Sequence, residues 1–283
     1  MKKLLFVMLG LGALFGLVLL TLPTILHKAG LHPEYNGDTV SLPGKRALII
    51  TTSHSVLAGP GEIEGPETGV FASEFTHPYY TFLDGGMEVD MASIQGGAIP
   101  IDPQSFYFMV KSPEDERYLN DPVAQAKVKN SIPIADVDIS QYDIVFIAGG
   151  WGASYDLAQS PVLAEKVTES YYGEKSAVIG GVCHGVLGLV NARDRDGELL
   201  INGRRMTGVT DKQIMELNID LTPLHPETEL RKAGVIFESQ TAIRDFFATH
   251  VVVDDEQRFV TGQNQNSGLE TSHKMMQIVA QKH

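Results

Sequence analysis

The order of apolar and polar positions along the chain predicts strands that alternate with helices. Residues 46–53, 142–150 and 176–183 are nearly continuous apolar runs, typical of strands buried on both faces of a sheet. Residues 68–86 and 160–174 place apolar side chains at helical spacing. Such alternation favours a parallel sheet. We therefore expect an α/β fold, a three-layer sandwich with a mainly parallel central sheet and helices on both faces.

The later part of the chain adds elements of both kinds. The pattern predicts a strand at 87–94, a helix opening at 184–192, hairpins at 196–209 and 250–262, and a closing helix at 268–281. The two hairpins would turn at Asn202-Gly203 and at residues 254–257. No boundary interrupts residues 46–283, so we treat them as one domain.

The N-terminal segment has a different pattern. After Lys2 and Lys3, the 23 residues from Leu4 to Leu26 carry no charge, which is long enough for a membrane helix. A cleaved signal peptide is less favoured because its apolar region is usually shorter and because His27 stands where cleavage after Ala29 needs a small residue. We expect an anchor or signal segment at 1–30, a linker at 31–45, and the α/β domain at 46–283.

Charge and composition indicate the orientation of the chain in a membrane and limit the classes of molecule that it can bind. The basic N-terminus would stay in the cytoplasm, which places the domain outside, in the periplasm, or secreted if the segment is removed. The formal net charge of −13 argues against nucleic acid as a partner, since binding it requires a basic face. The nine histidines are scattered without metal-ligand spacing, and no cofactor motif is evident, so we expect neither a metal nor a cofactor.

The only cysteine, Cys183, stands at the centre of "GVCHG" (181–185). This fits the G-x-nucleophile-x-G elbow between a strand and a helix, where glycines permit a strained turn. The dipole of the following helix and the imidazole of His184 would favour the thiolate. A lone thiol cannot form an internal disulfide, and the alternative is an inert buried side chain.

Four stretches together resemble the ThiJ/PfpI superfamily, which has the class I glutamine amidotransferase-like fold. They are "AVIGGVCHGVLGL" (177–189), "YDIVFIAGGWGASYDL" (142–157), "TGVFASEFTHPYYTFLDGGMEVDMASIQGG" (68–97) and "FVTGQNQNS" (259–267). They cover most of 46–283 in the right order. The chain looks most similar to the glyoxalase III and chaperone-like branch of that superfamily.

The resemblance implies a set of site residues. Cys183 would be the nucleophile, and Glu74 would hydrogen-bond its sulfur as a protonated partner or proton shuttle. His184 would be the general base, and its backbone N–H with that of Gly150 would form the oxyanion hole. A carboxyl beside a thiolate should have a raised pKa. The chain departs from the family where an acid should orient the histidine: Ile214 occupies that position.

Two acids lie close to Ile214 in the sequence, Asp211 and Glu216, and a small shift of register would bring either to His184. Without an acid the tautomer of His184 is less well fixed and turnover should be lower. The residues do not decide among these alternatives.

The expected function is that of a cofactor-independent cysteine enzyme. It would convert a small 2-oxoaldehyde such as methylglyoxal to a hydroxy acid, as the resemblance to glyoxalase III implies. The alternatives are a membrane-tethered chaperone or stress protein, a redox sensor, and a glutamine amidotransferase-like hydrolase using "HPE" at 225–227. The expected partners are a small carbonyl substrate and a membrane, and we leave open a homodimer.

Overall fold

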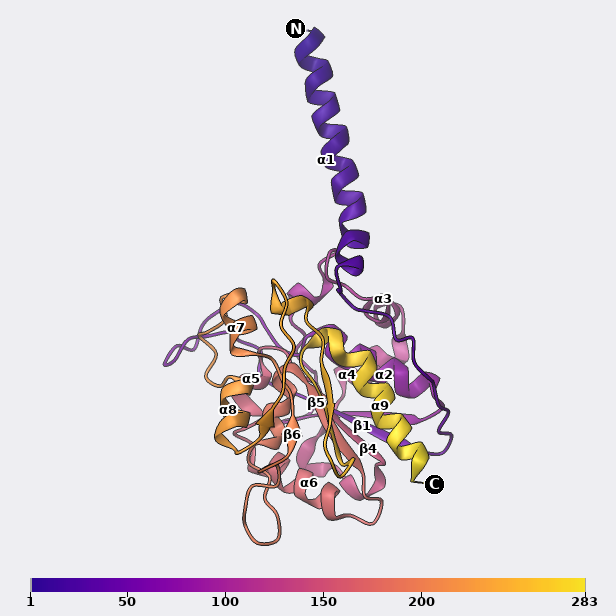
Figure 1. The fold of residues 1–283 in the computed structure, drawn as a ribbon, viewed down its shortest axis with the longest axis vertical. Coiled ribbons are helices and arrows are strands. Elements are labelled where there is room, and N and C mark those ends of the chain that lie inside the picture. The colour runs from indigo at the N-terminus through magenta and orange to yellow at the C-terminus, as the bar shows by residue number, and fades with distance from the viewer. Residues whose placement is uncertain (1, 283) are drawn as a thin grey trace.

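The computed structural model describes residues 2–282 and consists of a helix-covered sheet from which one long helix projects (Figure 1). The long helix is α1, Lys2–Lys28. Its apolar span Met8–Lys28 has a mean hydropathy of 2.2, and none of it is buried against the rest of the chain. By length and composition, α1 could cross a membrane.

The central sheet has seven strands in the order β3-β2-β1-β4-β5-β9-β8. Their bounds are β1 Arg46–Thr51, β2 Glu88–Ser93, β3 Ile132–Pro133, β4 Ile144–Ile147, β5 Val178–Val182, β8 Val251–Val253 and β9 Phe259–Gly262. All neighbours pair in parallel except β8 and β9, which form an antiparallel hairpin at one edge. The prediction of a mainly parallel sheet is confirmed.

Helices cover both faces of this sheet. The α-helices beyond α1 are α2 Ala72–Asp84, α3 Pro113–Leu119, α4 Pro122–Lys129, α5 Ala153–Asp156, α6 Pro161–Tyr172, α7 Asp211–Leu217, α8 Pro226–Lys232 and α9 Gly268–Gln281. The 3₁₀ helices are η1 Pro103–Phe106, η2 Ile134–Asp136, η3 Ile139–Gln141, η4 Cys183–Leu189, η5 Asp245–Phe247 and η6 Gln265–Ser267. A short separate sheet pairs β6 Arg205–Met206 with β7 Ile236–Phe237.

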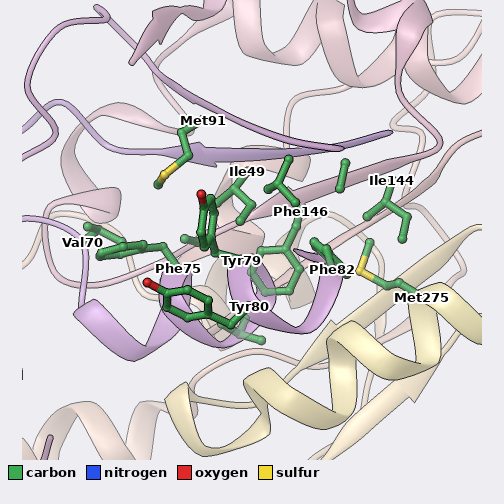
Figure 2. Packing of buried hydrophobic residues seen from close by; sticks show 14 of the residues in the cluster. Ile49, Val70, Phe75, Tyr79, Tyr80, Phe82, Met91, Ile144, Phe146 and Met275 are labelled. Atoms are coloured by element: carbon green, nitrogen blue, oxygen red, sulfur yellow. The ribbon is translucent and has the colours of Figure 1, made fainter. Parts of the chain in front are cut away.

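Alternation along the strands divides the core into two layers. Ile144 and Phe146 of β4 pack with α2 and α9 on one face, while Val145 and Ile147 pack with α6 and η4 on the other. Figure 2 shows the first layer, where Phe82 of α2 lies close to Phe146. Because every second side chain of a strand points to the same face, one apolar strand supplies both layers.

One local prediction is wrong. Residues 196–209 form no hairpin: β6 pairs in parallel with β7, and residues 200–203 form turns. Leu200 and Ile201 are buried in the second core layer, so their apolar character reflects packing rather than strand pairing. The helix predicted to open at 184–192 is present as the 3₁₀ helix η4, Cys183–Leu189.

The segment between α1 and β1 has no regular structure but packs against the domain. Leu31 and Leu42 are buried, and the N–H of Leu42 donates to the carbonyl of Gly85 at 2.7 Å. The ring of Tyr35 stacks on His273 of α9, with centroids 3.9 Å apart. Residues 31–42 therefore form a strap along the domain surface.

Candidate active site

The nucleophile elbow is formed where β5 ends. Cys183 has φ of +57°, a left-handed conformation that is costly for a residue with a side chain. Glycines on both sides make room for it: a Cβ at Gly181 or Gly185 would lie 2.1 or 2.2 Å from the carbonyl oxygen of Ile147. The thiol is thus held in a strained turn by close contact with the neighbouring strand β4.

Glu74 reaches the sulfur from the first turn of α2. Its carboxyl group is buried, accepts the N–H of Gly149 at 2.9 Å and lies near enough to the Cys183 thiol for each group to shift the pKa of the other. Gly149 was not singled out by the sequence reasoning, although the Gly149-Gly150 pair at the end of an apolar strand is a signal for such a turn. A Cβ at Gly149 would lie 2.5 Å from Oε2 of Glu74.

The two acidic groups of this pair both hold their protons more tightly than usual. Burial raises the pKa of Glu74 to about 8, and this effect outweighs the neighbouring hydrogen-bond donors, which lower the pKa. Burial, followed by the charge of Glu74, raises the pKa of the Cys183 thiol well above its ordinary value. The expectation of a resting thiolate favoured by the elbow is therefore wrong, because desolvation outweighs the local donors. The pair resists double ionisation and can pass one proton between sulfur and carboxyl.

His184 also lies beside the sulfur. Its Nδ1 is 3.5 Å from Sγ of Cys183, and its ring meets the edge of Trp151 with centroids 5.4 Å apart. Burial lowers the pKa of His184 to about 3, so the imidazole is neutral at neutral pH. Its Nε2 is buried and has no hydrogen-bond partner in the part of the chain that the structure describes. The ring is positioned by packing on Trp151.

Among the described residues 2–282, no acid hydrogen-bonds the ring of His184. Ile214 is buried in the first core layer. Asp211 accepts the hydroxyl of Thr228 at 2.7 Å, and Glu216 accepts the backbone N–H of Asp245 at 2.8 Å. Both candidate acids are thus engaged on α8 and on η5.

The His-x-Glu pair at 225–227 is arranged differently from a catalytic pair. His225 is near enough to lower the pKa of His184 by its charge. Glu227, however, accepts the N–H of Asp211 at 3.0 Å and pairs with Arg231 at 2.8 Å. These contacts tie Glu227 to the start of α7 and to its own helix, so the glutaminase arrangement has no support here.

Backbone donors surround the sulfur. The backbone N–H groups of Gly150 and His184 lie near enough to Cys183 to oppose the rise in its pKa, and that of Gly150 also opposes the rise in the pKa of Glu74. Gly150 has φ of +91°, and a Cβ there would lie 2.4 Å from the backbone nitrogen of Phe71. The N–H groups of Gly150 and His184, which were predicted to form an oxyanion hole, therefore lie together at the thiol. There they could stabilise the negative charge that develops on the oxygen of the attacked carbon.

The site is closed in this structure. Cys183 is 2% exposed, and Glu74 and His184 are equally buried. A substrate can reach the sulfur only when neighbouring side chains move. Within residues 2–282 no group of three or more His, Cys, Asp or Glu side chains is placed to hold a metal ion.

Comparison with known proteins gives a consistent result. Residues 67–278 match the model of the DJ-1/PfpI family. Glyoxalase 3 of Candida albicans is 28% identical over 224 residues, covering 75% of this chain and 90% of that protein. The crystal structure of glyoxalase III from Candida albicans superposes with a TM-score of 0.70 at 26% identity, covering 83% and 97% of the two chains. Rapid Encystment Protein 24 kDa of Francisella tularensis superposes with a TM-score of 0.75 at 32% identity, covering 83% and 99%.

Proposed function

Because this chain belongs to the DJ-1/PfpI family, we propose that it is a glutathione-independent glyoxalase. It would convert a small 2-oxoaldehyde such as methylglyoxal to the 2-hydroxy acid. The observation that carries the proposal is the buried pair of Cys183 and Glu74, whose pKa values are both raised and which lies beside the backbone N–H groups of Gly150 and His184. The names of several similar proteins, including glyoxalase 3 of Candida albicans, support this choice of reaction.

In the first step the sulfur of Cys183 adds to the aldehyde carbon. A carbon–sulfur bond forms, the thiol proton passes through Glu74 to the former carbonyl oxygen, and a hemithioacetal results. The developing negative charge on that oxygen is stabilised by the N–H groups of Gly150 and His184. The close contact of Glu74 with the thiol supports this role.

In the second step a proton moves from the former aldehyde carbon to the neighbouring carbonyl carbon, and the hydroxyl proton of the hemithioacetal moves to the oxygen on that neighbouring carbon. The first carbon is oxidised to a thioester and the second is reduced to an alcohol, so no outside oxidant or reductant is needed. Water then cleaves the thioester, which releases the hydroxy acid and restores the thiol. Glu74 is the better proton carrier, because its pKa of about 8 is closer to neutral pH than the pKa of about 3 of His184.

The test is lactate formation from methylglyoxal by the pure, reduced protein without glutathione. Wild type should produce lactate, Cys183→Ala should produce none, and Glu74→Gln should lose most of the rate. His225→Ala is a control close to the site, and it should retain activity because the proposed steps do not use it. Absence of lactate from folded wild type would refute the proposal, as would full activity in Cys183→Ala.

We also propose the location and the division of the chain. Segment 1–30 would anchor the protein in the membrane through α1. Residues 31–45 would link this anchor to the catalytic domain, which would comprise residues 46–283 and lie outside the cytoplasm. The apolar and unburied span of α1 supports this arrangement. The test is membrane fractionation with protease treatment of intact cells and the intact mass of the protein. A shortened, freely soluble protein would show instead that the segment is removed.

A further inference from the structure

The end of α1 is joined to the domain by a fixed turn. The N–H of Leu31 donates to the carbonyl of Leu26 at 3.0 Å, and that of Gly30 donates to His27 at 3.0 Å. Gly30 has φ of +110°, which a residue with a side chain rarely adopts. The helix and the domain therefore meet without a flexible spacer.

The residues after this turn are held firmly by the domain. Leu31 is 1% exposed, and the N–H of His32 donates to Oδ1 of Asn266 at 2.9 Å. The ring of His32 contacts the carbonyl of Val110 through Nε2 at 2.5 Å and packs edge-on against His77, with centroids 5.3 Å apart. The start of the domain is thereby fixed beside the end of α1.

The distance from helix to domain is correspondingly short. Three residue steps separate Lys28, the last residue of α1, from Leu31, and they span at most about 11 Å. Each headgroup layer of a bilayer is only about 5–8 Å thick. If the apolar part of α1 fills the hydrocarbon, the domain surface around Leu31 must lie at the lipid headgroups.

Two exposed aromatic side chains occur at this surface. Tyr107 is 58% exposed and Phe108 is 57% exposed. They belong to a turn closed by the N–H of Val110 to the carbonyl of Tyr107 at 2.9 Å, and Val110 is the residue that contacts His32. Tyr rings are enriched at the membrane–water interface, and Phe rings enter the boundary between headgroups and acyl chains. Their exposure would be unfavourable in water and is favourable against lipid.

The same end of the domain carries the catalytic edge of the sheet. Val182, which precedes the catalytic cysteine, pairs in parallel with Gly262, and Asn266 follows four residues later. The carboxyl ends of β5 and β9 therefore lie at the end where His32 binds. Figure 1 shows α1 leaving from this end, with α6 at the opposite end of the domain.

We propose that this end of the domain rests on the lipid bilayer, with Tyr107 and Phe108 as the side chains that enter the headgroup layer. The partner is the lipid surface itself, and the active-site edge faces it. This inference rests on the proposed anchoring by α1 and is independent of the proposed glyoxalase chemistry.

The experiment places a single tryptophan on each end of the full-length protein. Phe108→Trp and the control Tyr172→Trp are made separately in a Trp151→Phe background, which removes the one natural tryptophan. Tyr172 is 37% exposed at the end of α6, away from α1. Each protein is reconstituted in phosphatidylcholine vesicles with or without bromine on the acyl chains. Zwitterionic lipid avoids repulsion of the acidic chain.

Brominated lipid should quench the fluorescence at position 108 roughly twofold and leave position 172 nearly unchanged, because only an interfacial ring reaches the bromines. In detergent, iodide should quench both, which confirms that both are exposed. Equal quenching at 108 and 172 in vesicles that carry the protein on flotation would overturn the docking while leaving the anchor intact. Failure to float would overturn the anchor and the docking together. Lactate formation by the wild type is read separately and bears only on the proposed chemistry.

Discussion

The buried carboxyl group of Glu74 should make the protein less stable as the pH rises, and one substitution should remove this effect. Its pKa is raised from 4.5 to about 8, chiefly by burial. The folded protein therefore keeps this proton after the unfolded chain has released it. The stabilising contribution is complete below pH 4.5 and is lost as the pH rises through 8. Glu74→Gln keeps an oxygen for the N–H of Gly149 but has no proton to lose.

The expected magnitude follows from the shift. With about 1.36 kcal/mol for each pKa unit, ionisation of Glu74 costs the folded state roughly 1 kcal/mol at pH 5, roughly 3 at pH 7 and roughly 4.5 at pH 8.5. The stability of Glu74→Gln relative to wild type should therefore grow by roughly 3.5 kcal/mol from pH 5 to 8.5. Any effect of the substitution that does not depend on pH shifts the stability difference by the same amount at every pH. It therefore leaves the change in that difference between pH 5 and 8.5 unaltered.

The assay is urea unfolding of both full-length proteins in detergent micelles at pH 5, 7 and 8.5. The fluorescence of Trp151 reports on the site, because this ring contacts His184. Glu174→Gln removes a carboxyl from an exposed position and is the matched control for the change in net charge. A stability difference between Glu74→Gln and wild type that does not vary with pH would refute the reasoning.

Three further results are expected. The kcat/KM for methylglyoxal should rise with pH through an apparent pKa of about 8, and this limb should vanish in Glu74→Gln; a flat wild-type profile would contradict proton sharing. Gly149→Ala brings a Cβ within 2.7 Å of the backbone nitrogen of His184, so it should lower stability by about 2–3 kcal/mol and abolish lactate formation, whereas an unchanged Tm would show that the turn can yield. Arg204→Met leaves the buried carboxylate of Asp254 without its cation and should cost about 3 kcal/mol in urea unfolding. Adding Asp254→Asn should recover part of that loss, and no recovery would argue against the pair.

The parts of the fold that could be predicted are those where local pattern and burial agree. Strands β1, β4 and β5 are continuous apolar runs because helices cover both of their faces. Helix α9 was predicted with its observed bounds, since its apolar positions recur at helical spacing. The hairpin predicted at 196–209 is wrong because Leu200 and Ile201 are buried in a turn and Met206 pairs with β7, a tertiary effect that spacing alone does not reveal.

At the active site too, some features could be predicted from the sequence and others depend on contacts between distant segments. The pairing of Glu74 with Cys183 was expected from the family resemblance, and the structure brings the two side chains together. The protonation of the thiol was not foreseen, because desolvation depends on segments far apart in the sequence. The departure at Ile214 was visible in the sequence, whereas the packing of Trp151 on His184 required the structure.

The strap formed by residues 31–42 determines where the chain can be shortened. A soluble form that starts at residue 46 would uncover the side of α9 on which Tyr35 stacks, and would remove the N–H that Leu42 supplies to Gly85. A form that starts at Leu31 keeps these contacts and discards only the apolar helix. The natural starting point for crystallisation or solution studies is therefore fifteen residues earlier than the first strand suggests.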